Sequence, residues 1–168
     1  MLIPPVRKTW SPRGQTPIVA HRERHDRISA ISGISISPVK KRLGLYYSLY
    51  QGNVTQVQVC DFLRYLLRHL RGFVIVVWDN ASPHKGRQIR DFCGQCKRLH
   101  LEALPPYAPE LNPDEGVWSQ AKESMANGRP DNMGQLWWDV LDTLDALTTS
   151  QSSLRACIHK SELPLFLP

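Results

Sequence analysis

The stretch FVIVVW, from Phe73 to Trp78, is a short apolar run that stops at Asp79. It is rich in β-branched residues and apolar on both faces, which is the pattern of a central parallel strand. Ligands of open α/β sheets gather at the carboxyl ends of strands, so Asp79 is a candidate site residue. The segment that follows, Asn80 to Pro83, also has good turn chemistry, and Asp79 could instead be a simple turn acid.

A second informative stretch, LPPYAPELNPDEGVW, runs from Leu104 to Trp118. Its prolines stiffen a loop, and Asn112 followed by Pro113 is a favourable helix start. Glu115 then falls in the first helical turn, where it could hold a metal ion or cap the helix. Asp114 lies about 100° around the helix from Glu115, so these two acids are not expected to share a ligand. A carboxylate at a strand end and a second one on a rigid loop together suit divalent metal and phosphodiester chemistry.

The rest of the chain predicts strands and helices in alternation. Residues 28–37 and 43–49 alternate apolar and polar side chains, and we expect them to form an antiparallel hairpin. Thr55 to Gln58 fits a capping box that starts a helix ending near Gly72. Further helices are expected over residues 86–96, 113–125 and 136–147, with a short strand at 99–103. This order predicts an α/β fold with a mixed sheet covered by helices on both faces.

The charge of the chain is uneven. The 168 residues carry a net charge of +6, with 42% hydrophobic and 21% charged residues, as in soluble globular proteins. Residues 1–48 hold nine Lys and Arg against two acids, whereas the remainder holds twelve against thirteen. This excess favours a polyanionic partner, although a solvated basic loop is equally common. The candidate DNA-binding residues are Arg22, Arg24, Arg27, Lys40, Lys41, Arg42, Lys85 and Arg87.

Other functional signals are weaker. The longest apolar run is too short to span a bilayer, and the first residues lack the order of a signal peptide, so we expect a cytoplasmic location. Cys93 and Cys96 have the spacing of half a zinc site, followed by His100. A closed four-ligand site would need distant ligands, and two incidental helix cysteines are the favoured interpretation. His84 could assist a water molecule or bind phosphate, although a polar loop histidine is the commoner case.

The two stretches resemble the DDE transposases of the IS630/Tc1/mariner superfamily. The resemblance rests on VVWDNASPHK at residues 76–85 and on residues 104–118, with support from residues 2–14 and 42–47. It covers roughly residues 2–147 and implies an RNase H-like fold. The expected organisation is a catalytic domain over residues 1–150 and a C-terminal tail over residues 151–168.

The resemblance also implies an activity. Members of this superfamily cleave and join DNA strands with Mg²⁺ or Mn²⁺, using two metals held between three carboxylates. Asp79 matches the second acid of the family and Glu115 the third, whereas Asp114 matches a variable position. The implied partners are transposon ends and target DNA.

The first family aspartate has no counterpart in this chain. It lies on a first strand just before the segment that begins here at Leu2, and neither Asp26 nor Asp61 matches it. That strand would lie at the centre of the sheet, between the strands that begin at Ile28 and Phe73, and its absence would leave two unpaired edges. The region that recognises DNA ends also has no counterpart. Three explanations are open. The chain is a remnant of a decayed element, its start has been assigned too late, or an upstream reading frame encodes the missing part.

Our main hypothesis is therefore a transposase catalytic fragment that is inactive alone. It would act as a homodimer or with an upstream-encoded transposase part. The first alternative is a non-catalytic basic remnant that binds DNA or a partner. A third hypothesis is an RNase H-like nuclease that acts on RNA or branched DNA.

Overall fold

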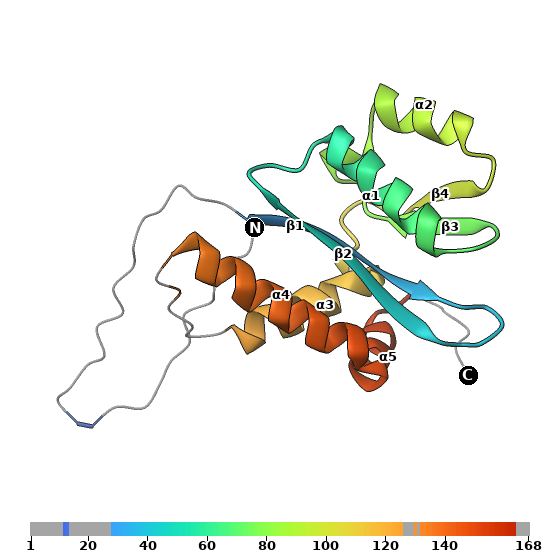
Figure 1. Cartoon of the computed structure of the whole chain (residues 1–168). Coiled ribbons are helices and arrows are strands. Elements are labelled where there is room, and N and C mark those ends of the chain that lie inside the picture. Colours follow the sequence, from blue (N-terminus) through green and yellow to red (C-terminus); the bar gives the residue numbers. More distant parts are fainter. Residues whose placement is uncertain (1–11, 14–27, 126–129, 131, 164–168) are drawn as a thin grey trace.

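The computed structural model describes residues 12–13, 28–125, 130 and 132–163 (Figure 1). Two strand pairs and five α-helices make up this part of the chain, with two short 3₁₀ turns at Ser82–His84 and Pro109–Leu111. The first half contains β1 (Ile28–Ile36), β2 (Leu43–Gln51), α1 (Gln56–His69) and β3 (Val74–Trp78). The second half contains α2 (Arg87–Gln95), β4 (Leu99–Ala103), α3 (Asp114–Ser124), α4 (Met133–Thr149) and α5 (Gln151–Lys160).

The predicted hairpin is confirmed. Strands β1 and β2 pair antiparallel, with Ile28 opposite Gln51 and Ile36 opposite Leu43. At the turn, the Ser37 amide donates a 3.0 Å hydrogen bond to the Arg42 carbonyl. The alternating side chains therefore set the register that the sequence predicted.

The helix α1 and the strands β3 and β4 also form where they were expected. Thr55 and Gln58 build the predicted capping box at the start of α1. The chain leaves α1 through Gly72, whose φ of 76° lies in the left-handed region that glycine tolerates. Strands β3 and β4 then pair in parallel, with Val74 opposite Leu99 and Trp78 opposite Ala103.

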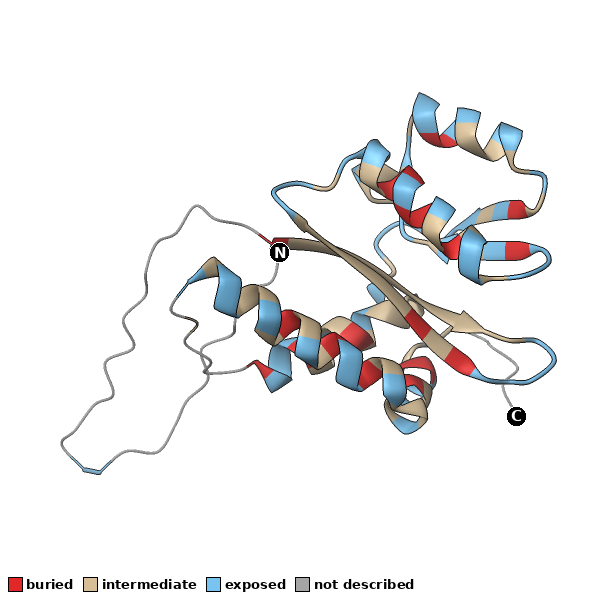
Figure 2. Cartoon of the chain, viewed as in Figure 1, coloured by how far each residue is buried: buried red, intermediate tan, exposed pale blue. Residues whose placement is uncertain are grey.

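The core of the described residues consists of two clusters that share the hairpin (Figure 2). One cluster joins β2 to α3, α4 and α5, and it includes Val117, Val140, Leu144 and Leu154, each with no exposed surface. The other joins α1 and α2 to β3 and β4. Figure 1 shows the hairpin running between these two groups of elements. The hairpin therefore supplies part of the wall of each cluster.

The strands of the predicted mixed sheet form two separate pairs, in agreement with the unpaired edges that the sequence analysis expected. Among the strands that the structure describes, β1 pairs with β2 and β3 pairs with β4, in two separate sheets. One face of β3 contributes Val74 to the second cluster, but Ile75 and Val77 on its other face are 67% and 46% exposed, and Phe73 just before the strand is 87% exposed. The expectation that β3 is buried on both faces was therefore wrong, because neither a strand nor a helix of the described chain covers that side.

Helix α5 is a second difference from the prediction. Residues 151–168 were assigned to a C-terminal tail, yet Gln151–Lys160 is helical and begins at a Ser150 cap. Leu154, Cys157 and Ile158 are buried against α3 and α4. Within the described residues, no helix combines the length and the apolar character that a membrane crossing requires.

Candidate active site and nucleic-acid interface

Asp79 lies directly after the last residue of β3. Its Oδ1 atom accepts a 2.9 Å hydrogen bond from the Ala81 amide, which closes the turn that follows the strand. The same oxygen lies 2.7 Å from His84 Nδ1, and the Asp79 side chain is half exposed. The turn chemistry and the strand-end position that the sequence indicated therefore occur together, and Asp79 keeps one side open to solvent.

His84 is fixed by more than Asp79. Its ring stacks on the Trp78 indole, with ring centroids 4.6 Å apart and an angle of 2° between the planes. Its Nδ1 atom also lies 3.2 Å from the Asp79 carbonyl, so a proton on Nδ1 can be shared between the backbone and the carboxylate. The interpretation of His84 as an ordinary loop histidine did not foresee these contacts.

The proline loop is joined to the end of β3 by backbone and side-chain hydrogen bonds. The Leu104 amide donates to the Trp78 carbonyl at 2.8 Å, and Asn80 Nδ2 donates to the Leu104 carbonyl. Further along the loop, Asn112 Oδ1 accepts a hydrogen bond from the Asp114 amide at 3.1 Å. Asn112 thus accepts a hydrogen bond at the start of α3, but α3 begins at Asp114, and Pro113 rather than the predicted Asn112 occupies the cap position.

Asp114 is held inward by two donors. Its Oδ2 atom accepts hydrogen bonds from Ser32 Oγ at 2.5 Å and from Trp118 Nε1 at 2.9 Å, which join α3 to β1. Its Oδ1 atom is buried without a hydrogen-bond partner among the described atoms. Burial raises the pKa of Asp114, the nearby charges of Glu115 and Asp79 add to this effect, and the two hydrogen bonds oppose it, so that the pKa is about 6. The sequence analysis treated Asp114 only as a neighbour of Glu115.

Glu115 is exposed in the first turn of α3. Its amide donates a 3.1 Å hydrogen bond to the Asn112 carbonyl, which fixes the backbone at this point. Asp114 is turned toward Ser32 instead, as expected for two acids that follow each other on a helix. The two acids of α3 therefore have different surroundings, Asp114 being partly buried and Glu115 exposed.

A single cleft brings these acids together. It has a volume of about 1590 Å³, and Asp79, His84, Asp114 and Glu115 all line it. Asp79 and Glu115 are 36 positions apart in the chain, so this is a tertiary relationship. Two carboxylates from different elements thus open into one cavity, close enough for their charges to act on Asp114.

The carboxylate oxygens that line this cleft are of the type that binds a hard cation. Carboxylate oxygens are the ligands that Mg²⁺ and Mn²⁺ prefer. However, no group of three or more His, Cys, Asp and Glu side chains in the described chain is arranged to hold a metal ion. Asp79 and Glu115 are two carboxylates of the described chain that line this cleft, and their role as metal ligands stays a prediction.

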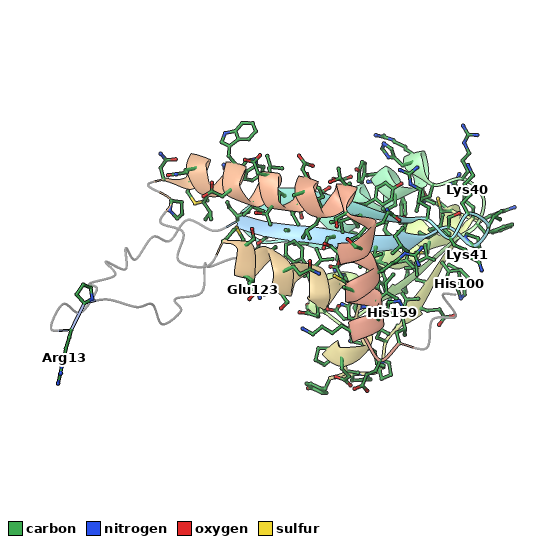
Figure 3. The ribbon with its side chains drawn as sticks, turned by 90° about the horizontal axis from the view of Figure 1, so that it is seen from below. Arg13, Lys40, Lys41, His100, Glu123 and His159 are labelled. Atoms are coloured by element: carbon green, nitrogen blue, oxygen red, sulfur yellow. The ribbon has the colours of Figure 1, made fainter. Side chains whose placement is uncertain are left out.

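The predicted DNA-binding residues are dispersed. Arg22, Arg24 and Arg27 lie outside the described residues. Lys40, Lys41 and Arg42 are exposed together at the turn of the hairpin, where Figure 3 shows Lys40 and Lys41 at the end of the molecule.

Lys85 and Arg87 lie instead beside the Asp79 turn. Lys85 and Arg90 line a smaller cavity of about 430 Å³ that also includes His84. Arg87 is exposed and forms a 3.4 Å ion pair with Asp91. The structure therefore separates the basic residues into a hairpin group and a group near the acids.

The cysteine pair does not form a recognisable metal site. Cys93 and Cys96 have free thiols, and burial raises the pKa of Cys93. His100 lies 2.6 Å from Glu102, with both side chains exposed on β4. The three residues that suggested half a zinc site thus have separate surroundings.

The sequence profile of the DDE superfamily endonucleases matches residues 2–136. The chain belongs to this family. The resemblance to transposases of the IS630/Tc1/mariner superfamily is thereby confirmed. A DDE endonuclease or transposase catalytic domain is the function class that the match supports. No curated relative matches the chain.

Solved structures agree on the fold. The catalytic domain of the Mos1 mariner transposase is 23% identical, with a TM-score of 0.55, over 79% of this chain and 75% of that one. The Mos1 mariner paired-end complex with Mn is 21% identical, with a TM-score of 0.65, over 95% and 49%. The Mos1 paired-end complex with the left transposon end is 21% identical, with a TM-score of 0.59, over 94% and 47%.

These likenesses confirm the predicted RNase H-like α/β fold. The DDE chain described here spans about half the length of the transposase chains in the two paired-end complexes.

Proposed function

We propose that this chain provides the part of a DNA transposase active site that contains Asp79 and Glu115. Both acids would bind Mg²⁺ or Mn²⁺, and the DNA would be a transposon end. The observation that carries the proposal is the shared cleft of Asp79 and Glu115, reached from two elements far apart in sequence. The Mos1 structures support it, because one of them contains Mn and another a left transposon end.

The residues around the two acids have definable roles in this proposal. His84 holds the Asp79 carboxylate from one side and leaves its exposed side for a ligand. Ser32 and Trp118 hold Asp114 away from solvent, so that Glu115 is the acid of α3 that faces outward. A divalent ion bound between Asp79 and Glu115 would stabilise negative charge on a scissile phosphate. The three residues His84, Ser32 and Trp118 would thus position the acids.

We further propose that the purified 168-residue chain cleaves DNA poorly by itself. Two carboxylates bind a divalent ion more weakly than three, and no group of three is arranged for metal in the described part of the chain. Efficient, Asp79-dependent nicking of terminal-repeat DNA in Mn²⁺ would contradict the proposal that the chain cleaves DNA poorly. It would leave unchanged the proposal that Asp79 and Glu115 bind the metal ion.

Metal binding can be tested without relying on cleavage of DNA. Bound Fe²⁺ generates hydroxyl radicals that cut the polypeptide next to the ion, so the fragments identify the site. We expect cuts near residues 79 and 115 in the wild type and their loss in Asp79→Asn and Glu115→Gln. Asp61→Asn is the matched control, because Asp61 is an exposed acid of α1 paired with Arg64. Cuts that persist in both cleft variants would refute the proposed ligands.

A second candidate function is DNA binding without catalysis. It is favoured by the exposed group of Lys40, Lys41 and Arg42 at the hairpin turn, remote in sequence from the acids. Such binding would weaken steeply with salt and would not change in Asp79→Ala or Glu115→Ala. Salt titrations of these two variants therefore separate the candidates: only the first predicts that Mn²⁺ improves DNA binding and that either substitution removes this gain.

A further inference from the structure

Helix α2 ends in a pair of cysteines. Cys93 lies in its last turn and Cys96 is its C-terminal cap, and the Cys96 amide donates a 3.1 Å hydrogen bond to the Cys93 carbonyl. A hydrogen bond across this spacing closes a turn whose first and last Cα atoms lie less than about 7 Å apart. Disulfides span Cα distances of about 4.4–6.8 Å, so the backbone holds the two residues near the separation that a disulfide requires.

The side chains of the two cysteines lie on the same side of α2. Ile89, Cys93 and Cys96 follow each other at intervals of four and three residues, which is the spacing of one helix face. Ile89 is buried in the core cluster of α1, β3 and β4, and both cysteines pack against that cluster while staying half-buried. His100, which the sequence spacing grouped with them, contacts Glu102 instead. The two cysteines are therefore neighbours, and His100 has other partners.

The smaller cavity gives access to one of the two thiols. Its volume of about 430 Å³ falls within the roughly 300–1,000 Å³ of pockets that take small ligands, and Cys93 lines it whereas Cys96 does not. The other two thiols are buried: Cys60 contacts the Gln88 carbonyl, and Cys157 accepts a hydrogen bond from Gln120. A reagent that enters the cavity therefore meets Cys93 first.

The wall of this cavity combines apolar and cationic side chains. Ile89 and Leu101 contribute apolar surface, and Lys85 and Arg90 contribute two positive charges. Neither cation forms an ion pair with an acid of the described chain. Lysine and arginine form strong, charge-assisted hydrogen bonds with carboxylates. The cavity therefore suits a small molecule that carries carboxylates beside a less polar part, next to the Cys93 thiol.

We propose that this cavity binds a small anionic disulfide of the glutathione type, and that Cys93 and Cys96 are a thiol–disulfide exchange site. The Cys93 thiolate attacks one sulfur of the bound disulfide, which forms a mixed disulfide and releases one thiolate. The Cys96 thiolate then attacks the Cys93 sulfur, which forms the Cys93–Cys96 bond and releases the second thiolate. Two protein thiols are oxidised, and the small disulfide is reduced to two thiols that take up the two protons. This chemistry uses neither Asp79 nor Glu115, so it does not depend on the proposed function.

The exchange should be slow, and its product should restrain one turn. Burial raises the pKa of the Cys93 thiol, and the nearby Cys60 and Cys96 thiols raise it too, so little reactive thiolate is present at neutral pH. The Leu99 amide donates a 3.0 Å hydrogen bond to the Cys96 carbonyl, and the Arg98 guanidinium donates to carbonyls at the end of α1. A Cys93–Cys96 bond would therefore restrain the turn that joins α2 to β4 and contacts α1.

Peptide mapping of the full 168-residue chain after incubation with glutathione disulfide tests the proposal. Trypsin cuts after Arg90 and Lys97, so residues 91–97 form one peptide that contains both cysteines. We expect this peptide to become lighter by two hydrogen atoms, without bound glutathione. Cys96→Ser should instead accumulate glutathione on Cys93, because nothing resolves the mixed disulfide. Cys157→Ser is the matched control, and it should react as the wild type does.

The role of the two cations is tested by the rate of oxidation. Replacing Lys85 and Arg90 by glutamine should slow the reaction with glutathione disulfide by about tenfold, since a cleft of one charge concentrates a reactant of the opposite charge. The rate with uncharged hydroxyethyl disulfide should not change. The same replacement of Lys40 and Arg42 at the hairpin turn is the charge-matched control. Circular dichroism shows whether each variant is folded, and Arg90→Gln alone replaces the double variant if it is not.

Several outcomes would overturn the proposal. A cross-link between Cys60 and Cys93 would identify a different pair. Equal attachment of glutathione to Cys93 and Cys157 would mean that the cavity does not select the thiol. The same rate and product in the chain unfolded by urea would mean that the fold contributes nothing to the reaction. An unchanged rate with glutathione disulfide in the variant of Lys85 and Arg90 would mean that the cavity does not bind the anion.

Discussion

The imidazole of His84 lies parallel to the indole of Trp78, at 4.6 Å between ring centroids. Trp78 is the last residue of β3, so the stacking joins the turn after the strand to the strand itself. It also fixes His84 Nδ1 at 2.7 Å from the Asp79 carboxylate. The orientation of the Asp79 carboxylate therefore depends on the stacking of His84 on Trp78.

The first prediction concerns this histidine. A group that orients a metal ligand typically contributes about 10- to 100-fold to metal affinity. We expect His84→Ala to lower Mn²⁺ affinity by about tenfold, measured by the loss of the free-ion electron paramagnetic resonance signal. His100→Ala is the control, because His100 contacts Glu102 on exposed β4. Unchanged affinity in His84→Ala would show that Asp79 needs no support or binds no metal.

The second prediction concerns Asp114 and pH. Burial raises its pKa from 3.8 to about 6, so the folded protein holds this proton more tightly than the unfolded chain. Stability from this group is therefore present below about pH 4 and is lost as the pH rises to about 6, by at most about 3 kcal/mol. Asp114→Asn removes the titration and keeps an oxygen that can accept hydrogen bonds from Ser32 and Trp118.

Urea unfolding of the wild type and Asp114→Asn between pH 4 and pH 7 measures this effect. The variant should gain stability relative to the wild type as the pH rises, because only the wild type then carries a buried charge. A constant difference across this range would mean that Asp114 titrates normally.

The third prediction compares two glycines inside helices. A Cβ atom added at Gly116 would lie 3.0 Å from the Cys157 Cβ and 3.1 Å from its Cα, on α5. We expect Gly116→Ala to destabilise the protein by about 1–3 kcal/mol, because α3 and α5 must separate. At Gly94 of α2 an added Cβ meets no atom within 4 Å, and Gly94→Ala should stabilise by about 0.5–1 kcal/mol. Thermal unfolding of both variants checks the opposite signs.

The fourth prediction concerns the hairpin turn. If Lys40, Lys41 and Arg42 contact DNA phosphates, replacing all three by alanine should lower the salt dependence of binding. The slope of log affinity against log salt should fall by up to about 3, since each phosphate contact contributes about 0.9. The charge-matched control replaces the exposed Lys97, Lys122 and Lys160. Fluorescence anisotropy at several salt concentrations measures both, and equal slopes would exclude the turn as a DNA contact.

Local hydrogen bonds and side-chain alternation made much of the fold predictable. The capping box of Thr55 and Gln58 is formed within four residues, and the hairpin needs only the alternation on its two strands. Helix α5 was missed although its signals are local. Ser150 is a cap residue, and Leu154, Cys157 and Ile158 follow at helical spacing. A search for caps and short apolar stripes to the end of the chain would have found it.

The site was harder to predict because its contacts are tertiary. Asp79 and Glu115 were recognised from their motifs and line one cleft, but their roles stay predictions. The hydrogen bond between Ser32 and Asp114 joins residues 82 positions apart, so no local spacing indicates it. The uncovered face of β3 could not be foreseen either, because an apolar run shows that a strand can be covered, and not what covers it.

The hairpin shared by the two core clusters has a consequence for folding. Ile31 and Tyr46 pack against the cluster of α1, whereas Leu43 and Leu45 of the same ribbon belong to the cluster of α3, α4 and α5. If the hairpin of β1 and β2 unfolds, both clusters lose part of their packing surface at the same time. Both clusters should therefore unfold in one cooperative transition on heating or in denaturant, without a stable intermediate in which only one cluster is folded.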